Sequence, residues 1–194
     1  MRQQQQPAAP GFLKQVANFG MSIGLYGRCC IAANVIIYIL QLIFFSGEAQ
    51  MLHVALTFGA NYQSIVSANQ YYRVVTAAFS HANFPHILFN MCAMAIFSVK
   101  LEKAYGSNFF FVINIWLMVL SSALELLYDH VRVFWLPESL GGAELELLVS
   151  YSVGYSAILF GLVMLECLSG DKHVNIYCCK VRKILLPFAY LFLS

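Results

Sequence analysis

Long apolar runs separated by short polar stretches are the main pattern of the chain. An α-helix needs about 20 predominantly apolar residues to cross the hydrocarbon core of a bilayer. Four runs approach or reach this length with a few flanking residues, and a fifth stops with the chain: 31–45, 84–99, 109–127, 147–168 and 184–194. The pattern predicts an all-α fold, a polytopic transmembrane helical bundle of four full membrane helices and a truncated fifth.

The composition agrees with a membrane protein. Hydrophobic residues make up 60% of the 194 residues and charged residues only 10%, with a mean hydropathy of +0.71. Soluble domains are typically about 45–50% apolar and about 25% charged. The net charge of +2 is too small to indicate a nucleic-acid partner. We therefore expect the lipid bilayer to be the main environment of this chain.

Positive charge alternates from one side of the predicted membrane helices to the other. Basic residues exceed acidic ones before residue 31, after 99 and after 168, whereas 46–83 is balanced and 128–146 is acidic. Because cytosolic loops carry the excess of Lys and Arg, this pattern predicts a cytosolic N-terminus. Loops 46–83 and 128–146 then face the lumen or exterior. We expect residues 1–27 to be a cytosolic, partly disordered tail and 28–194 to form the membrane domain.

Polar side chains inside predicted membrane helices are costly and are therefore candidates for a functional site. His86 and Asn90 are four residues apart, so they lie on one face near the lumenal end of their helix. Ser156 lies between Gly154 and Gly161 in another segment that begins at the lumen. Either group could instead serve helix packing, through hydrogen bonds between helices or close contact of small residues. The shared lumenal depth of the two groups favours a functional site.

These residue types fit nucleophilic catalysis. A serine hydroxyl attacks a peptide carbonyl when a base removes its proton. The oxyanion that forms needs fixed donors in a water-poor site. His86 and Asn90 carry side-chain N–H groups, and the backbone N–H of Ser156 near a helix start can add another. Gly154 permits a tight backbone beside the hydroxyl.

Five sequence features, in this order, resemble the rhomboid family of intramembrane proteases. They are YYRVVTAAF of 71–79, similar to the family's WR-x-x-T-x-x-F; His81; HILFN of 86–90, similar to H-x-x-x-N; LEKAYGS of 101–107, similar to LE-x-x-x-GS; and GYSA…G of 154–161, similar to the nucleophile motif G-x-S-G-x-x-x-G. The resemblance runs from about Arg28 to the end of the chain. In detail it is closest to the eukaryotic endomembrane rhomboids.

The resemblance implies a role for each matching residue. Ser156 is the nucleophile, and His86 with Asn90 builds the oxyanion hole. The other motif residues are structural: Arg73, His81, Glu102, Gly106, Gly154 and Gly161, the last packing its helix on a sixth membrane helix. The family needs no cofactor or metal, and its substrates are membrane-anchored proteins cut near the lumenal membrane face. We expect an endomembrane location, in the ER or Golgi; the sequence indicates no oligomeric state.

Three features depart from the family pattern. Tyr72 replaces the family's Trp, and Ala157 replaces the Gly after the nucleophile, which adds a methyl group beside the site. The family's general base is a His in G-x-x-x-H on the sixth helix, whereas this chain ends in the fifth. We expect a C-terminally truncated sequence. Residues 1–194 alone should show no proteolysis, because an unactivated serine hydroxyl is a poor nucleophile.

The main alternative is a catalytically inactive rhomboid-like protein that binds membrane clients for quality control or trafficking. The missing base favours it, while the retained Ser156, His86 and Asn90 favour a protease. An aspartyl protease is excluded, because Asp129 and Asp171 are predicted on opposite sides of the membrane. The H-E-x-x-H motif of a zinc protease is absent. A transporter would show internal repeats, and the sequence shows none.

The predicted topology can be tested with engineered N-glycosylation sites. An acceptor placed well clear of the membrane within 128–146 should be modified, because this loop is predicted to be lumenal. An acceptor within 170–182 should stay unmodified. Gel mobility with and without a glycosidase measures both, and the reverse pattern would overturn the orientation together with the shared depth of Ser156 and Asn90.

Overall fold

The computed structural model of the chain describes residues 11–45, 47, 50–135, 151–168, 173–176 and 179–182. Its first half contains α1 (Phe12–Ser22), α2 (Leu25–Phe44), α3 (Gln50–Phe58), the π-helical turn η1 (Gln63–Ser67), α4 (Arg73–Phe79) and α5 (Phe84–Phe97). The second half contains the π-helical turn η2 (Ser98–Glu102), α6 (Lys103–Tyr105), α7 (Ser107–Phe134), α9 (Ser156–Leu168), β1 (His173–Ile176) and β2 (Cys179–Arg182). The predicted all-α class is confirmed.

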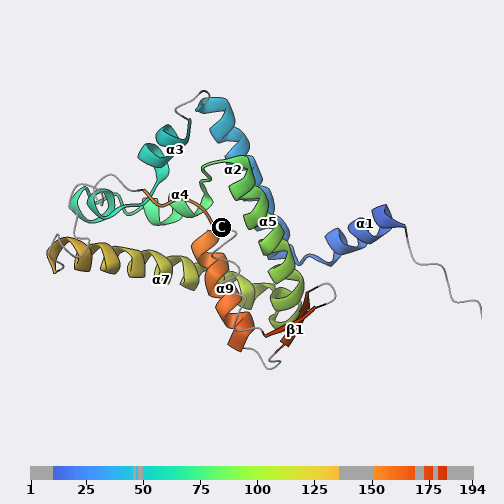
Figure 1. The fold of residues 1–194 in the computed structure, drawn as a ribbon. Helices are drawn as coiled ribbons and strands as arrows, with labels where there is room; N and C mark the ends of the chain where they lie inside the picture. Colours follow the sequence, from blue (N-terminus) through green and yellow to red (C-terminus); the bar gives the residue numbers. More distant parts are fainter. Residues whose placement is uncertain are drawn as a thin grey trace, which may run out of the picture.

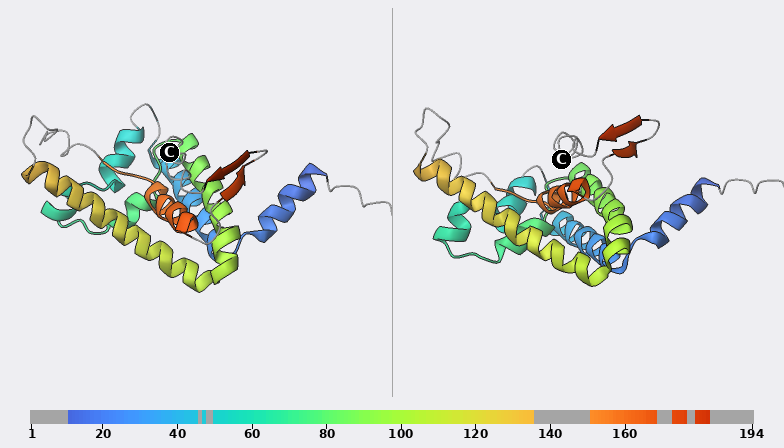
Figure 2. Two further views of the ribbon diagram at one scale, coloured as in Figure 1. Left: turned by 60° about the horizontal axis from the view of Figure 1, so that its bottom comes forward. Right: turned by 90° about the horizontal axis from the view of Figure 1, so that it is seen from below.

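Three of the described helical segments are long and apolar enough to cross a membrane: α2, the continuous stretch Phe84–Tyr105 and α7. The chain is therefore an integral membrane protein. In Figure 1 α2 and α5 run side by side, and α9 packs against both α5 and α7. The short helices α3 and α4 lie to the left of the upper parts of α2 and α5 in Figure 1, and α1 projects away to the right in Figures 1 and 2.

The fourth predicted helix is much shorter than its apolar run. We predicted 147–168, but α9 begins only at Ser156 and has 13 residues, fewer than a membrane crossing needs. Residues 151–155 are not helical, because Ser152 forms an isolated antiparallel bridge with Ala60. Residues 147–150 and the predicted fifth segment, 184–194, lie outside the described residues.

The boundaries of two other helices also differ from the prediction. The first membrane helix begins at Leu25 rather than near Ile31, so it starts before our domain boundary at residue 28. α7 continues to Phe134, past the predicted end at Leu127. The charged residues that we assigned to the loop from 128 therefore begin inside the last turns of α7, where Arg132 lies close to the helix C-terminus, a favourable place for a cation.

The start of α2 is held by a carboxylate from another helix. Glu102, only 3% exposed, accepts hydrogen bonds from the backbone N–H groups of Tyr26 (2.7 Å) and Gly27 (3.0 Å). It also accepts from the hydroxyls of Ser98 (2.6 Å) and Ser107 (2.5 Å). The first N–H groups of a helix have no partner within the helix, and an anion is stabilised there. Glu102 thus joins α2, η2 and α7 at one end of the bundle.

The loop between α2 and α5 is organised around a buried arginine. Arg73 is 6% exposed and donates to the backbone carbonyls of Gly59 (2.6 Å) and Leu56 (2.9 Å). These carbonyls belong to the C-terminal end of α3, where a cation is favourable. The hydroxyl of Thr76 donates to a third carbonyl there, that of Phe58 (3.1 Å). Arg73 therefore packs α3 against α4, and residues 50–83 form a folded layer rather than an open loop.

One β-hairpin follows α9 in the described part of the chain, where the sequence analysis predicted none. β1 and β2 pair antiparallel, with His173 opposite Arg182 and Val174 opposite Val181. β-branched residues such as Val favour strands, but four residues in each strand are too few to show a clear alternating pattern. The hairpin lies near the lower ends of α5 and α9 in Figure 1 and does not alter the helical core.

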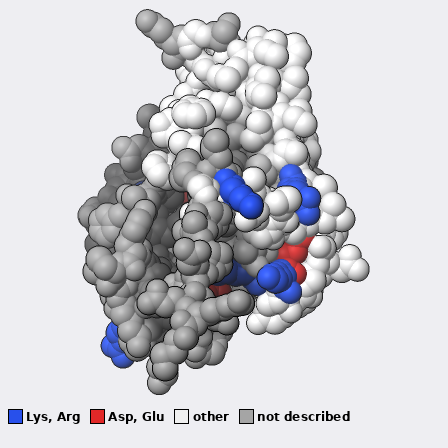
Figure 3. Space-filling model, turned by 90° about the vertical axis from the view of Figure 1, so that its right-hand side faces the viewer, with Lys and Arg blue, Asp and Glu red and all other residues white. Residues whose placement is uncertain are grey.

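Exposed charge on the described surface gathers toward one end of the helices. In Figure 3 the upper part of the face carries no coloured Lys, Arg, Asp or Glu, whereas blue and red side chains gather lower down. The exposed side chains of Arg28, Lys100 and Lys103 lie at this end, because Glu102 ties the start of α2 to η2. Above it the exposed residues of α2 are apolar, including Ile36, Ile43 and Phe44. This separation of charge fits a membrane-spanning body.

We predict that Glu102→Ala lowers the free energy of unfolding by on the order of 3 kcal/mol. The change leaves two backbone N–H groups and two hydroxyls without an acceptor inside the bundle, and each unpaired buried donor costs about 1 kcal/mol or more. The measurement is reversible unfolding in detergent micelles. Lys103→Ala is the matched control, because the neighbouring side chain is exposed; equal losses in both variants would contradict the role of Glu102.

Candidate active site

The chain leading to Ser156 is held by backbone hydrogen bonds to the layer before α5. Ala60 and Ser152 exchange two such bonds, of 2.9 and 2.8 Å. Two residues further on, the N–H of Gly154 donates to the carbonyl of Ala77 in α4 (2.8 Å). The apolar segment is therefore extended up to Gly154 and becomes helical at Ser156. These bonds fix where α9 begins and where the serine lies.

Gly154 brings this segment against the imidazole of His86. Its φ of +115° is a conformation that side chains other than glycine rarely adopt. A Cβ atom at this position would lie 2.5 Å from Cε1 and 2.6 Å from Nε2 of His86, and 3.6 Å from Nδ2 of Asn90. The first two distances are far shorter than a normal van der Waals contact. Both the backbone angle and the approach to His86 thus require glycine.

His86 lies in the first turn of α5, and the local sequence explains why the helix begins there. The side chain of Asn83 accepts a hydrogen bond from the backbone N–H of His86 (2.9 Å), and Pro85 occupies the first turn. Asparagine is a preferred N-cap residue, and proline is tolerated where no helical N–H bond is needed. Our prediction that this helix begins at Phe84 is confirmed.

Asn90 lies one turn deeper than His86 and is oriented by a second histidine. Asn90 is 1% exposed and His81 is fully buried. Asn90 Nδ2 lies 3.0 Å from His81 Nε2. Burial lowers the pKa of His81 to about 4, with a further contribution from nearby His86. His81 is therefore neutral at neutral pH, and its Nε2 accepts the proton of the Asn90 amide.

Ser156 is the first residue of α9 and is half-buried. Its hydroxyl makes no hydrogen bond within the part of the chain that the structure describes. By comparison, the hydroxyl of Ser80 bonds back to the carbonyl of Thr76 (2.8 Å), as serines in helices commonly do. A serine at a helix start has no preceding helical carbonyl to bind, so its hydroxyl is left for another partner.

Tyr155, which the sequence analysis did not single out, anchors the residue before Ser156 in the core. Its side chain is 1% exposed, and its hydroxyl donates to Asn114 Oδ1 in α7 (3.1 Å). The hydroxyl of Tyr26 in α2 lies 3.2 Å away, and the ring packs edge-on against Phe79 of α4. Side chains from three helices thus hold Tyr155. The one sequence signal that could have found Tyr155 is the cost of burying a hydroxyl without hydrogen-bond partners.

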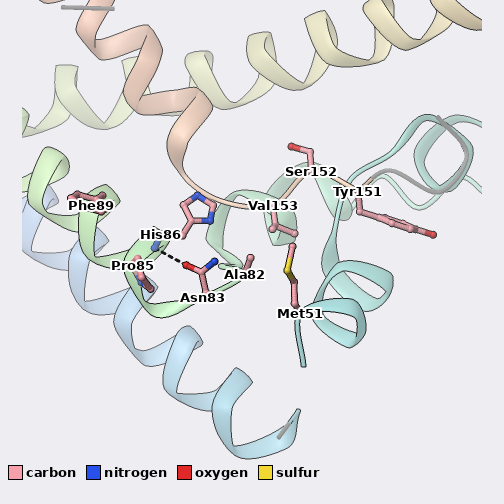
Figure 4. A pocket seen from close by; sticks show the side chains of 9 residues that line it. All are labelled: Met51, Ala82, Asn83, Pro85, His86, Phe89, Tyr151, Ser152 and Val153. Atoms are coloured by element: carbon pink, nitrogen blue, oxygen red, sulfur yellow. Dashed lines mark hydrogen bonds between the residues drawn. The ribbon is translucent and has the colours of Figure 1, made fainter. Parts of the chain in front are cut away.

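A cavity of about 530 Å³ opens beside His86. Figure 4 shows the imidazole between the first turn of α5 and the chain that leads to α9, with Met51 of α3 opposite. Phe89, Val153 and Met51 give the wall an apolar character, while His86, Asn83 and Ser152 add polar atoms. A volume of this size is in the range of ligand sites.

The structure thus brings some of the predicted site residues together and separates others. His81, His86, Asn90 and Gly154 lie in contact, and Ser156 follows two residues after Gly154. Arg73, Glu102 and Gly106 lie elsewhere in the fold. Gly106 has a φ of +86° and its N–H donates to the carbonyl of Glu102 (2.8 Å), ending one helix before α7.

Gly161 lies against α7. In the structure a Cβ atom at this position would lie 2.5 Å from Cδ2 of Leu117, so the missing side chain makes room for α7. The neighbouring residues Ile158 and Leu162 of α9 are 2% and 0% exposed. Packing of Gly161 against a sixth membrane helix, which the resemblance implies, stays a prediction.

The described residues contain no group of three or more His, Cys, Asp or Glu side chains that could hold a metal ion. The geometry defines a class: an all-α membrane protein in which the segment before a serine at a helix start packs, through Gly154, against a histidine and an asparagine.

Comparisons with known proteins identify the family. The Rhomboid domain profile matches residues 68–194, well over half of the chain. The chain therefore belongs to the rhomboid family. This confirms the resemblance seen in the sequence motifs.

Curated relatives agree with this assignment. Rhomboid-like protein 14, mitochondrial, of Arabidopsis thaliana is 26% identical over 126 residues, which are 61% of this chain and 32% of that protein. Rhomboid-like protein 15 of the same plant is 29% identical over 127 residues, 59% of this chain and 28% of that protein. The Rhomboid protease AarA of Providencia stuartii is 26% identical over 106 residues, 55% of this chain and 37% of that protein. The chain spans about a third of the length of these relatives.

We predict that Gly154→Ala destabilises the protein by about 1–3 kcal/mol and displaces His86, because alanine is strained at positive φ and its methyl group meets the imidazole. Gly47→Ala is a matched control: Gly47 has a similar φ of +106°, but a Cβ atom there would meet nothing within 4 Å. Unfolding in micelles gives the stability, and the NMR shift of the His86 ring reports its displacement. Equal effects of the two variants would contradict the close contact.

Proposed function

We propose that the protein is a rhomboid-type intramembrane serine endopeptidase, with Ser156 as nucleophile and with His86 and Asn90 as the oxyanion hole. The observation that carries this proposal is the approach of Gly154 to His86, which brings the start of α9 beside the first turns of α5. Close packing alone does not account for a histidine against a glycine with φ +115° and a serine hydroxyl without a partner in the described residues.

In this proposal the chemistry is acyl transfer. The Ser156 oxygen attacks the carbonyl carbon of the substrate peptide, and the carbonyl oxygen becomes negatively charged. Nδ2 of Asn90 and a ring N–H of His86 donate to that oxygen, together with the N–H at the start of α9, where the helix dipole favours an anion. Fixed donors in a water-poor site stabilise the transition state without reorganisation. Asn90 donates an amide proton to His81, and this contact orients the amide beside His86.

The general base belongs, by family resemblance, to a histidine on a sixth membrane helix. Two of the described histidines are engaged elsewhere: His130 Nδ1 lies 3.0 Å from the hydroxyl of Tyr62, and the ring of His53 packs near Phe45. His81 and His86 lie against the segment that leads to the serine, so they are the first alternatives. The proposed activity therefore applies to a chain that carries such a histidine.

The substrates in this proposal are membrane-anchored proteins. The cavity beside His86 is bounded by α3 and α5 and by the segment before α9, all at the end of the bundle away from Arg28, Lys100 and Lys103. With a cytosolic N-terminus this end is lumenal, so cleavage takes place near the lumenal membrane face. An endomembrane location follows from the same family resemblance.

The second candidate function is the binding of membrane clients without cleavage. It is favoured by one observation, that no third histidine in the described part of the chain lies against the segment before Ser156. The protein would then use the same cavity to hold a client helix. The experiment below separates the two functions.

We predict that Ser156→Ala abolishes cleavage of a membrane-anchored reporter by the complete gene product, while insertion and folding persist, because only one hydroxyl is removed. Asn90→Ala should lower the rate about a hundredfold, since loss of one oxyanion donor costs on the order of 3 kcal/mol. Ser67→Ala, a change of an exposed serine in the layer before α5, serves as control. Cleavage is followed by immunoblotting and normalised for expression.

Full activity of Ser156→Ala would show that the nucleophile is another residue. If the native protein cuts no reporter but retains one in a pull-down that depends on the cavity residues, it is a client-binding protein. Cleavage by residues 1–194 alone that depends on Ser156 would make His81 or His86 the base.

A further inference from the structure

The first helix, α1, has one apolar and one polar face. Successive residues of an α-helix are rotated by about 100°, so residues three or four apart share a face. Val16 and Phe19 lie on one face, and Lys14, Asn18 and Ser22 lie on the other. Such a helix is amphipathic, and it is stabilised when another surface covers its apolar face.

No described part of the chain covers the apolar face of α1. The side chains from Lys14 to Ser22 are all exposed, Val16 and Phe19 among them. In Figures 1 and 2 the helix projects away from the bundle. Isolated helices shorter than about 12–15 residues are only marginally stable in water. α1 has 11 residues, and Gly20 in its interior disfavours the helix further. Its stability therefore requires a covering surface.

The link between α1 and α2 is short and is held by the bundle. It consists of Ile23 and Gly24, both extended, with ψ angles of 130° and 170°. The N–H of Gly24 donates to the hydroxyl of Ser98 in η2 (3.0 Å). The carboxylate of Glu102 lies so close to Gly24 that there is no room for a Cβ atom. The chain thus leaves the bundle at a fixed point.

This fixed point lies at the level of the lipid headgroups. α2 has 20 residues, so it is about 30 Å long, the thickness of the hydrocarbon core. Two extended residues span at most about 7 Å, and the headgroup region adds about 5–8 Å on each side. The C-terminal end of α1 is therefore within the headgroup region. The exposed side chains of Arg28, Lys100 and Lys103 at the same end agree with this depth.

We propose that α1 is a surface anchor that lies along the bilayer, with Val16 and Phe19 inserted among the lipid chains and Asn18 facing water. Helices of this kind bury their apolar face about 5–10 Å into the boundary between headgroups and acyl chains. The lipid surface is the occupant because the two-residue link keeps α1 at that surface permanently, whereas a partner protein would have to be recruited. The anchor is independent of the proposed protease function.

The depth of each face can be measured on the full chain in phosphatidylcholine nanodiscs that hold one protein copy. Phe19→Trp places an indole on the apolar face, and Asn18→Trp, the matched control, places one on the polar face. The fluorescence of Trp116 and Trp135 is subtracted by using the unmodified protein. Brominated lipid should quench the added fluorescence of Phe19→Trp, and aqueous iodide that of Asn18→Trp. Quenching of both by iodide, of both by lipid, or of Phe19→Trp by neither would overturn the proposal.

Hydrogen exchange in the same nanodiscs tests whether the lipid stabilises α1. Phe19→Glu should speed exchange of the α1 amides about tenfold or more, because the side chain can no longer be transferred into the acyl chains. Asn18→Glu adds the same charge to the polar face and should leave the exchange rate unchanged. Equal rates in the two variants would contradict the anchor. Both side chains are exposed in the structure, so neither change disturbs the bundle.

Discussion

The position of the serine depends on a few backbone hydrogen bonds made before α9 begins. Ala60 pairs with Ser152, and Ala77 accepts from Gly154. These bonds keep residues 152–154 out of the helix that begins at Ser156. They also bring the backbone of Gly154 against the imidazole of His86. Because backbone groups inside a membrane protein must be paired within the protein, this arrangement is tolerated only where another layer of chain supplies the partners. The folded layer of 50–79 supplies these partners. Arg73 holds this layer together through its hydrogen bonds to the carbonyls of Gly59 and Leu56.

The end of the bundle at the start of α2 is stabilised by the buried carboxylate of Glu102. The carboxylate of Glu102 accepts hydrogen bonds at the start of α2 and from Ser98 and Ser107, and so joins α2, η2 and α7. Gly24 and Gly27 have no side chains because a Cβ atom at either would meet Glu102 or Ser98 at 2.1 Å. One end of the molecule is thus fixed by an anion at a helix start, while the cavity beside His86 lies toward the other end.

The sequence was sufficient for those features that depend on local pattern. His86 and Asn90 were placed on one face by their spacing, and the start of α5 follows from Asn83 and Pro85. The start of α9 could not be predicted, because apolar residues continue through 147–155 and only the tertiary pairing of Ser152 with Ala60 accounts for the non-helical conformation of 151–155. Tyr155 was missed for a related reason: its partners in α2, α4 and α7 are distant in sequence, and a tyrosine in an apolar run resembles any core residue. The contact of Gly161 with Leu117 in α7 could not be predicted either, since a glycine does not reveal which helix it faces.

The central claim is that the Gly154 segment presents Ser156 as a reactive nucleophile beside His86. The most direct measurement is labelling of the complete gene product with a fluorophosphonate, which reacts with activated serines, followed by mass spectrometry of the labelled peptide. Our account predicts a single labelled residue, Ser156, and a large loss of labelling in Gly154→Ala but not in Gly47→Ala. Labelling of a different serine, or undiminished labelling of Gly154→Ala, would contradict it.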